Sequence, residues 1–407
     1  MIDKIGVASI FKNEYPFIVE WLAYHRSLGV KRFFVADNES DDGTRELLIC
    51  LRNLGYIELE FQPVVEGENS QLAAYKMLLE KYGGETDWLA FVDADEFLVL
   101  ERDDISIEDY LREISEIKDV GAVAVNWAVY GSSHWVTAGP GFVTDRFILR
   151  AEQSRSVNRH YKTLLNTSAC RGVGTNPHSF KIGKDKIYVN SLGQRLTDDE
   201  LGGLTKDPVW GGIRINHYVV KSRGEFFTKK RPRGRPGGKT RAAEFFSQHD
   251  VNDVEDRLSD VRAVALQKEY KKIVAALHDA GFEYSEQVDK NALFYSTGSG
   301  GLKFRVDGVS FENERIDCKG WVAAPKNNCV DFNLLVNYTV VVRAVSVERM
   351  TRIDVARHLK GDPDARYGFK CVFDVKKAIE EAGPIDLVEL CIGAGDNNVG
   401  VITRLVI

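Results

Sequence analysis

The chain has 407 residues, of which 44% are apolar and 28% charged, a composition typical of a soluble globular protein with two or three domains. Its formal net charge of −6 excludes a general attraction to nucleic acid or anionic membranes. No apolar run approaches the ~20 residues of a membrane span, and the first residues predict a strand rather than a signal peptide. The six cysteines are scattered without metal-ligand spacing, so we expect reduced thiols in a cytoplasmic protein.

Residues 5–97 predict strands that alternate with helices. The strands are expected at 5–10, 31–36, 57–61 and 88–92, and the helices at 16–29, 44–53 and 69–82. This alternation predicts an open α/β sheet with mainly parallel strands. Ligands bind such sheets outside the carboxyl ends of the strands, where the polar loops 12–14, 37–44 and 93–96 fall. We therefore expect a crevice for a nucleotide diphosphate. The GxGxxG and Walker sequences are absent, which disfavours a dehydrogenase or a P-loop NTPase.

The apolar run that begins at Trp88 leads directly into three carboxylates, Asp93, Asp95 and Glu96. Unpaired carboxylates at the end of a buried strand are costly, so they need a charge partner. Mg²⁺ and Mn²⁺ take oxygen ligands from one or two carboxylates and from the phosphates of a substrate. Asp93 and Asp95 are therefore candidates to hold a divalent metal against a diphosphate, with Glu96 as a structural acid behind them. For an isolated Asp-x-Asp sequence, the alternative is a solvated acidic turn.

The pattern changes after residue 97. We expect strands at 121–130, 142–150 and 213–222, and a helix at 253–280. The Gly- and Ser-rich segment 296–301 is typical of a flexible linker. Beyond it, strands are expected at 316–322, 331–336, 340–347, 368–375 and 387–392, which favours a small sandwich or barrel. The predicted organisation is an α/β domain at 1–285, a linker at 286–301 and a small all-β, sandwich-like domain at 302–407.

Several motifs in chain order resemble the family 2-like and family 92-like glycosyltransferases. They are FKNE at 11–14, EWLAYH at 20–25, DNESDDGT at 37–44, DADEF at 93–97, and NHYVVKS at 216–222 with Glu225, Phe226 and Lys229 after it. The resemblance covers residues 5–256 and implies a GT-A (Rossmann-like) fold, a nucleotide-sugar donor, a divalent metal and an inverting transfer. The sequences GWV at 320–322 and YGF at 367–369 resemble an accessory β-domain of bacterial polysaccharide and lipopolysaccharide glycosyltransferases.

The same resemblance implies roles for individual residues. Asp37 would contact the base or ribose, Asp93 and Asp95 would hold the metal and the diphosphate, and His217 would be a late metal ligand or diphosphate contact. Lys162 and Lys221 would neutralise the leaving diphosphate. The residues expected to line the donor site are Lys12, Asn13, Glu14, Asp37, Asn38, Asp42, Asp93, Lys162 and Lys221.

Transfer of a sugar also needs a carboxylate that deprotonates the acceptor hydroxyl. Glu225 and Asp145 are the candidates for this base, and no spacing separates them. His178 lies in a Pro-containing loop where the chain departs from the family pattern, and its role stays open. Trp127 and Trp135 are candidates to stack on an acceptor sugar, with burial in the core as the alternative.

The basic segment 229–239 contains Arg-Gly-Arg-Pro, the core of an AT-hook that reads the minor groove of DNA. AT-hooks usually occupy tails, whereas this segment lies inside the enzyme-like region of a chain with negative net charge. We therefore favour a basic loop that closes over a diphosphate or touches an anionic acceptor, over DNA binding or a plain solvated loop.

The sequence thus predicts a metal-dependent inverting glycosyltransferase that uses a nucleotide-diphosphate sugar. The resemblance alone suggests a cell-surface glycan or glycolipid acceptor, such as lipopolysaccharide, O-antigen or capsule. We expect a cytoplasmic protein with peripheral contact at the inner membrane. The alternatives are an inactive sugar-binding or scaffold protein, a nucleotidyltransferase and an AT-hook DNA-binding protein. A nucleotidyltransferase would normally carry a Gly-rich phosphate loop, which is absent.

Overall fold

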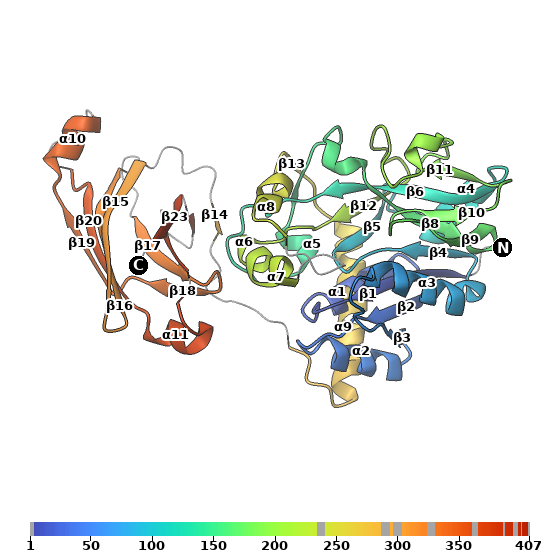
Figure 1. The fold of residues 1–407 in the computed structure, drawn as a ribbon, viewed down its shortest axis with the longest axis horizontal. Helices are drawn as coiled ribbons and strands as arrows, with labels where there is room; N and C mark the ends of the chain where they lie inside the picture. The colour runs from blue at the N-terminus through green and yellow to red at the C-terminus, as the bar shows by residue number, and fades with distance from the viewer. Residues whose placement is uncertain are drawn as a thin grey trace. The chain divides into compact units, whose positions relative to one another are not determined.

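The computed structural model describes residues 4–233, 241–285, 294–295, 303–323, 330–359, 365–385, 387–393, 398–399 and 401–405 (Figure 1). The chain divides into two compact units. The N-terminal unit comprises Met1–Ser133, Phe142–Lys221 and Arg233–Gln287, and the C-terminal unit comprises His134–Gly141, Ser222–Pro232 and Val288–Ile407. The predicted linker at 286–301 lies outside the described residues except for 294–295, and so does the 234–239 part of the basic segment. No helix among the described residues is long and apolar enough to cross a membrane.

The first half of the N-terminal unit has the predicted α/β alternation. Its elements are β1 (Ile5–Phe11), α1 (Ile18–Ser27), β2 (Arg32–Asp37), α2 (Thr44–Asn53), β3 (Glu58–Phe61), α3 (Ser70–Tyr82) and β4 (Trp88–Phe91). The strands β1 to β4 are parallel, in the order β3-β2-β1-β4. The prediction of a parallel α/β sheet is therefore confirmed.

The second half of the unit extends this sheet. It contributes β5 (Glu96–Leu100), β6 (Val120–Val129), β8 (Tyr161–Asn166), β11 (Ile187–Asn190) and β12 (Ile213–His217), which complete the order β3-β2-β1-β4-β8-β6-β12-β5 with β11 paired to β6. β8 is antiparallel to β4 and β6, and β5 is antiparallel to β12. The carboxyl ends of β4, β6 and β12 and the amino ends of β5 and β8 therefore share one edge, which we call the carboxyl edge.

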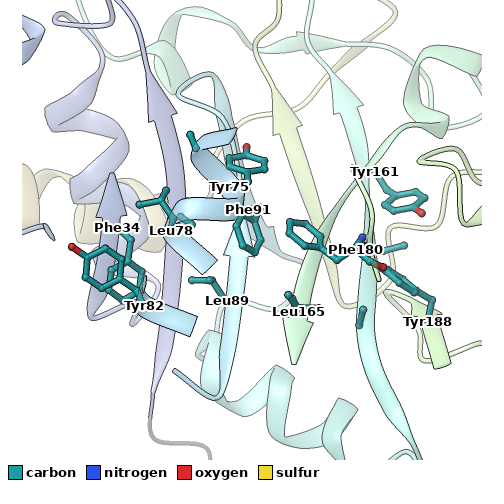
Figure 2. Close-up of a cluster of buried hydrophobic side chains, with 14 of the residues drawn as sticks. Phe34, Tyr75, Leu78, Tyr82, Leu89, Phe91, Tyr161, Leu165, Phe180 and Tyr188 are labelled. Atoms are coloured by element: carbon teal, nitrogen blue, oxygen red, sulfur yellow. Dashed lines mark hydrogen bonds between the residues drawn. The ribbon is translucent and has the colours of Figure 1, made fainter. Parts of the chain in front are cut away.

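Helices cover both faces of the sheet because alternate side chains of a strand point to opposite faces. On one face, Phe91 packs against Tyr75 of α3 and Phe34 packs against Tyr82 of the same helix, as Figure 2 shows. Phe33 on the other face packs against Trp21 of α1, with ring centroids 6.0 Å apart. The remaining helices of the unit include α4 (Ile107–Ser115), α8 (Glu244–His249) and α9 (Asp260–Asp279), and its minor strands are β7 (Leu149–Arg150), β9 (Cys170–Val173), β10 (Phe180–Ile182) and β13 (Val254–Glu255).

Two predictions of secondary structure are wrong. The expected strand at 142–150 is the short helix α5 (Val143–Arg146) followed by β7. The buried carboxylate of Glu20 accepts hydrogen bonds from the backbone amides of Val143 (2.7 Å) and Thr144 (3.0 Å), which satisfies the first turn of that helix. The expected helix at 253–280 begins only at Asp260, after the side chain of Ser259 accepts from the amide of Arg262.

The C-terminal unit is a small two-sheet structure, in agreement with the predicted sandwich-like domain. One sheet has the order β15-β16-β20-β19 and the other β18-β17-β21-β23. Their strands are β15 (Lys303–Glu312), β16 (Arg315–Ala323), β17 (Asp331–Val336), β18 (Val340–Arg343), β19 (Ser346–Met350), β20 (Gly368–Asp374), β21 (Val388–Gly393) and β23 (Val401–Leu405). The expected strand at 340–347 is split between the sheets. Buried side chains of both sheets, such as Phe369 and Leu334, form one core.

Candidate active site at the carboxyl edge

Asp93 follows β4 and is held by three side-chain donors. Its Oδ1 atom accepts from the amide of Gln71 (2.6 Å) and the hydroxyl of Tyr75 (2.8 Å), both on α3. The ammonium of Lys162, the second residue of β8, lies 3.0 Å from the same oxygen. The Asp93 side chain nevertheless keeps 31% of its surface exposed. The core helix α3 therefore fixes a carboxylate that is still open to solvent.

A side chain of α1 holds the backbone of the turn that carries Asp93, Asp95 and Glu96. The indole N–H of Trp21 donates to the backbone oxygens of Asp93 (3.1 Å) and Glu96 (3.0 Å). The Oε2 atom of Glu96 accepts from the amide of Asp93 at 2.8 Å. A turn with its backbone held on two sides loses little conformational entropy when a ligand binds. Glu96 thus has the structural role that the sequence suggested.

Burial and neighbouring charges shift the pKa values of Asp93, Glu96 and Lys162. Burial would raise the pKa of Asp93, but the Lys162 ammonium holds the pKa of that carboxyl below its usual value. Burial raises the pKa of Glu96 to about 8, opposed by Lys162 and reinforced by Asp93 and Asp95. Burial would lower the pKa of Lys162, but the carboxylates of Asp93 and Glu96 raise it well above its ordinary value. The surroundings therefore favour an ionised Asp93 and a charged Lys162, and they disfavour the ionised form of Glu96.

Asp95 and His217 meet on the other side of the turn. Antiparallel pairing places His217 at the end of β12 opposite Glu96, the first residue of β5. The Nε2 atom of His217 lies 3.6 Å from Oδ1 of Asp95, and both side chains are buried. The structure therefore brings together Asp93, Asp95, Lys162 and His217, which come from three separate segments of the sequence.

The donor candidates from the first two loops interlock with one another. The side chain of Asn13, whose φ is 56°, donates to Asp41 at 2.7 Å, and the Asp41 amide donates back to Asn13 at 2.9 Å. The fully buried Asp37 accepts from the guanidinium of Arg45 at 2.7 Å. Asn38 donates to the backbone oxygen of Gln62. These contacts fix the two loops beside each other at the carboxyl ends of β1 and β2.

The other residues of those loops have local partners. The carboxylate of Asp42 accepts from the amides of Tyr15 (3.3 Å) and Thr44 (3.0 Å). The amide of Glu14 donates to the hydroxyl of Thr44 at 2.9 Å. Lys12 precedes them at the end of β1, with a partly buried side chain. The Asp42 carboxylate therefore helps to order the loop, and the residue is exposed.

Lys221 ends the N-terminal unit in a left-handed conformation, with φ 54°. Its ammonium lies 4.2 Å from the ring centroid of Phe17, at the start of α1. A non-glycine residue with positive φ is strained and is typical of functional sites. The observation agrees with a site role for Lys221.

The two candidate bases belong to different units of the chain. Glu225 belongs to the C-terminal unit, where its carboxylate accepts from the amide of Ser222 at 3.1 Å in a capping box of α6 (Arg223–Glu225). Asp145 is exposed on α5. Among the described residues, no hydrogen bond or ion pair joins Asp145 to the acidic turn. Trp135 also falls in the C-terminal unit.

Aromatic side chains continue the site from His217. The ring of Trp127 on β6 lies 4.2 Å from that of His217, 4.8 Å from that of His160 and 5.4 Å from that of His178, between centroids. Burial and Lys162 lower the pKa of His178 to about 3, and burial followed by His249 lowers the pKa of His160. Both imidazoles are therefore neutral at pH 7, and His178, which had no predicted role, joins the group.

The sequence analysis missed Gln71, Tyr75 and His160. Gln71 and Tyr75 are four residues apart on α3, so they lie on the same helix face. A polar residue and a tyrosine at that spacing just after the Asn69 cap were the available signal. His160 lies two residues before Lys162 in the sequence, but only the folded structure places it beside Trp127.

Comparisons with known proteins agree with this geometry. Residues 5–176, less than half of the chain, match the model of glycosyltransferase family 92. A glycosyltransferase family 92 protein of Oryza sativa subsp. japonica is 28% identical over 215 residues, which cover 52% of this chain and 32% of that protein. One of Ricinus communis is 30% identical over 198 residues, covering 46% and 33%. The chain thus spans about a third of the length of these curated relatives.

Two solved structures are also similar to parts or all of the chain. S. aureus TarS is 12% identical, with 99% of this chain and 77% of that chain covered and a TM-score of 0.30. Glucosyl-3-phosphoglycerate synthase from Mycobacterium tuberculosis, solved with Mn²⁺, UDP-glucose and phosphoglyceric acid, is 18% identical, with coverages of 49% and 74% and a TM-score of 0.27. The sequence matches make the N-terminal part of the chain similar to glycosyltransferases of family 92.

Proposed function

We propose that this protein transfers a sugar from a nucleotide-diphosphate donor to an acceptor hydroxyl at the carboxyl edge of the N-terminal unit. The observation that carries the proposal is the meeting of Asp95 with His217 beside the ionised Asp93. These groups lie where a parallel α/β sheet binds its ligands. Most of this edge falls within the segment that matches glycosyltransferase family 92.

A divalent metal fits the Asp95–His217 pair. A carboxylate oxygen and an imidazole nitrogen 3.6 Å apart are suitable ligands for Mn²⁺ or Mg²⁺, although imidazole suits Mn²⁺ better. The described residues contain no group of three or more His, Cys, Asp or Glu side chains suited to a metal. Oxygens of the donor's diphosphate would therefore complete the coordination. When bound, the metal would supply Lewis-acid stabilisation of the leaving diphosphate.

Asp93 and Lys162 have supporting roles in this proposal. Lys162 is 1% exposed and already paired with Asp93 and Glu96, so it keeps Asp93 ionised and oriented. Lys221, whose backbone has a positive φ, is the cation that we propose for the leaving diphosphate. A preorganised charge of this kind stabilises the transition state without reorganisation during the reaction. The resemblance implies a single displacement at the anomeric carbon with inversion.

The base and the acceptor are the open parts of the proposal. A carboxylate deprotonates the acceptor hydroxyl, and Asp145 and Glu225 are its candidates. The comparison of Asp145→Asn with Glu225→Gln assigns the role, because only loss of the base removes transfer while donor binding persists. A cell-surface glycan or glycolipid as acceptor rests on the sequence resemblance. A cytoplasmic location with contact at the inner membrane is proposed from the scattered cysteines and from this kind of acceptor.

Donor binding tests the proposal. A ligand that binds only the folded protein raises its melting temperature by mass action. We expect one nucleotide sugar from a panel to raise it in the presence of Mn²⁺ and to have a smaller effect with EDTA. Asp95→Asn should lose the metal-dependent part, and the surface variant Asp104→Asn should retain it. If no nucleotide sugar shifts the melting temperature of the wild type with or without Mn²⁺, the proposal is wrong.

A further inference from the structure

Trp127, His160 and His178 form a second part of the site, which we call the Trp127 cluster. All three residues are partly exposed. The ring of Trp127 lies beside the rings of His160, His178 and His217. The rings of His160 and His178 lie 5.5 Å apart. An open arrangement of one indole and two imidazoles next to the acidic turn is accessible to whatever the turn binds.

The backbone holds Trp127 in place on both sides. Its amide donates to the oxygen of His160 at 2.9 Å, and its own oxygen accepts from the indole of Trp210 at 2.9 Å. Parallel pairing of β6 with β12 places Trp127 opposite Ile215, two residues before His217, so both rings lie on the same face of the sheet. The indole is thus a fixed platform, with the metal candidate His217 at its edge.

The hydrogen-bonding groups of the cluster are complementary to a hydroxyl. The Nε1 atom of Trp127 is buried, and no hydrogen-bond partner for it exists among the described residues. An indole N–H can only donate. The Nδ1 atom of His178 lies 2.9 Å from the backbone oxygen of Tyr161, which can only accept, so Nδ1 carries the proton and Nε2 is an acceptor. A sugar hydroxyl can accept from the indole and donate to the imidazole.

The charges around the cluster disfavour an anionic ligand. The two imidazoles are neutral at pH 7. The ammonium of Lys162 contributes to the low pKa of His178, and it is paired with Asp93 and Glu96. The side chains of the cluster itself offer no positive charge to a carboxylate or phosphate, whereas an uncharged sugar can pack its C–H face on the indole.

We propose that the Trp127 cluster is the subsite that binds an uncharged sugar ring in this enzyme. This inference rests on the proposed function and names the class of substrate that the site selects. The ring comes from one of two sources, the sugar of the donor or the terminal sugar of the acceptor. The same chemistry recognises both, and the experiment separates them.

Gly202 and Gly203 provide a matched pair of substitutions that tests the position of His178. A Cβ atom on Gly203, where φ is +96°, would lie 2.8 Å from the Cβ atom of His178, too close for both to keep their places. A Cβ atom on the neighbouring Gly202 would meet nothing within 4 Å. Gly203→Ala should therefore displace His178, whereas Gly202→Ala should not.

The experiment measures sugar binding by the full chain with ligand-observed NMR. The probes are the methyl glycosides of glucose, galactose and N-acetylglucosamine, with methyl glucuronide and galactose 6-phosphate as charged counterparts. We expect an uncharged glycoside to bind, and Trp127→Phe and His178→Ala to weaken it about tenfold, since each removes about one hydrogen bond. Gly203→Ala should weaken it as well, and Gly202→Ala should bind as the wild type does.

Competition identifies the source of the ring. If a nucleotide sugar displaces the glycoside while the nucleoside diphosphate alone does not, the subsite holds the donor's sugar. If glycoside and nucleotide sugar bind together, it holds the acceptor. Equal binding of charged and uncharged glycosides would overturn the inference, as would binding that Trp127→Phe, His178→Ala and Gly203→Ala leave unchanged.

The proposed function can fail separately from this inference. If the wild type binds an uncharged glycoside at the cluster but binds no nucleotide sugar, the proposed subsite stands and the proposed function is wrong. If the wild type turns over a nucleotide sugar and all three variants bind and transfer normally, the proposed function stands and the proposed subsite is wrong.

Discussion

Nε2 of His217 lies 3.6 Å from Oδ1 of Asp95, although the two residues belong to segments far apart in the chain. Two backbone features fix this distance. The antiparallel register of β12 and β5 places His217 opposite Glu96, and the amide of Tyr218 donates to the backbone oxygen of Asp95 at 2.9 Å. The pair is therefore a property of the sheet and not of two mobile side chains.

If Asp95 and His217 bind one metal ion together, their substitutions should not be additive. We expect Asp95→Asn and His217→Gln each to weaken Mn²⁺-dependent nucleotide binding by tenfold or more, and the double variant to be little worse than either. Titration calorimetry with a nucleoside diphosphate, with and without Mn²⁺, measures this coupling. Fully additive losses would show that the two side chains act at separate sites.

Lys162 should matter for stability as well as function. Its ammonium is 1% exposed between Asp93 and Glu96, so Lys162→Met leaves a buried carboxylate without its counter-ion. Loss of one partner from a buried ion pair should reduce the free energy of unfolding by about 3 kcal/mol. Lys186→Met is the control, because Lys186 pairs with Asp119 and Asp185 at the surface and should cost less than about 1 kcal/mol. Urea denaturation of both variants compares them, and equal losses would contradict a buried network.

His25 should make the N-terminal unit sensitive to acid. Its Nδ1 atom pairs with the oxygen of Trp21 at 2.9 Å and its Nε2 atom accepts from the amide of Leu98 at 3.3 Å, so both nitrogens are used by the neutral ring. Burial lowers the pKa of His25 to about 4 from an ordinary 6.5. The unfolded chain therefore binds more protons between these values, and the contribution of His25 to stability is complete above pH 6.5 and declines as the pH falls towards 4.

The variant His25→Gln isolates this effect from the other titrating groups. We expect the stability advantage of the wild type over His25→Gln to shrink between pH 7 and pH 4.5, as measured by urea denaturation at several pH values. Substitution of the exposed His278 by Gln should give no such trend of comparable size. An advantage that stays constant with pH would contradict a neutral buried His25.

Gly224 tests how the segment after Lys221 is packed within the C-terminal unit. A Cβ atom there would lie 2.7 Å from the backbone oxygen of Tyr338 and 3.2 Å from that of Val136. Backbone atoms cannot easily give way, so Gly224→Ala should destabilise the C-terminal unit by about 1–3 kcal/mol. Gly84→Ala, where a Cβ atom meets nothing within 4 Å, should be close to neutral. Thermal unfolding followed by calorimetry measures both, and an unchanged Gly224→Ala variant would contradict this close packing.

The neighbouring ion pair explains why this segment belongs to the C-terminal unit. Arg223 pairs with the buried Glu389 of β21, and its guanidinium lies 5.3 Å from the ring of Phe227 and 5.2 Å from that of Tyr338. The sequence predicted one continuous enzyme domain up to residue 285. Nothing local in residues 222–232 indicates a partner on a strand more than a hundred residues later, so only tertiary contacts could reveal it.

The sequence was informative wherever local patterns decide the structure. Hydrophobic periodicity and turn residues predicted β1 to β4 and α1 to α3, and they placed Asp93 and Asp95 at the end of a buried strand. The strand β5, which begins at Glu96, was missed because it follows β4 after only four residues. The segment 142–150 was misassigned because the carboxylate that caps α5 comes from Glu20, far away in sequence.

In the candidate site, too, motifs predicted some residues and only tertiary packing reveals the others. The acids, Lys162 and His217 followed from motifs, whereas the donors to Asp93 on α3 and the rings around Trp127 depend on how the helices and strands pack. Asp37 and Asp42 stay predicted donor contacts, and the structure adds partners that the motifs did not indicate. These partners are Arg45 for Asp37, and the amides of Tyr15 and Thr44 for Asp42.

The most direct test of the central claim is turnover of a nucleotide sugar. The full chain is incubated with each donor of a panel and Mn²⁺, with and without glycan acceptors, and release of the nucleoside diphosphate is measured. The structure predicts release from one donor by the wild type, lost on chelation of the metal, reduced at least a hundredfold in Asp95→Asn and retained in Asp104→Asn (~3 kcal/mol or more of transition-state stabilisation). Release that Asp95→Asn leaves unchanged, or no release from any donor with any acceptor, would contradict the account.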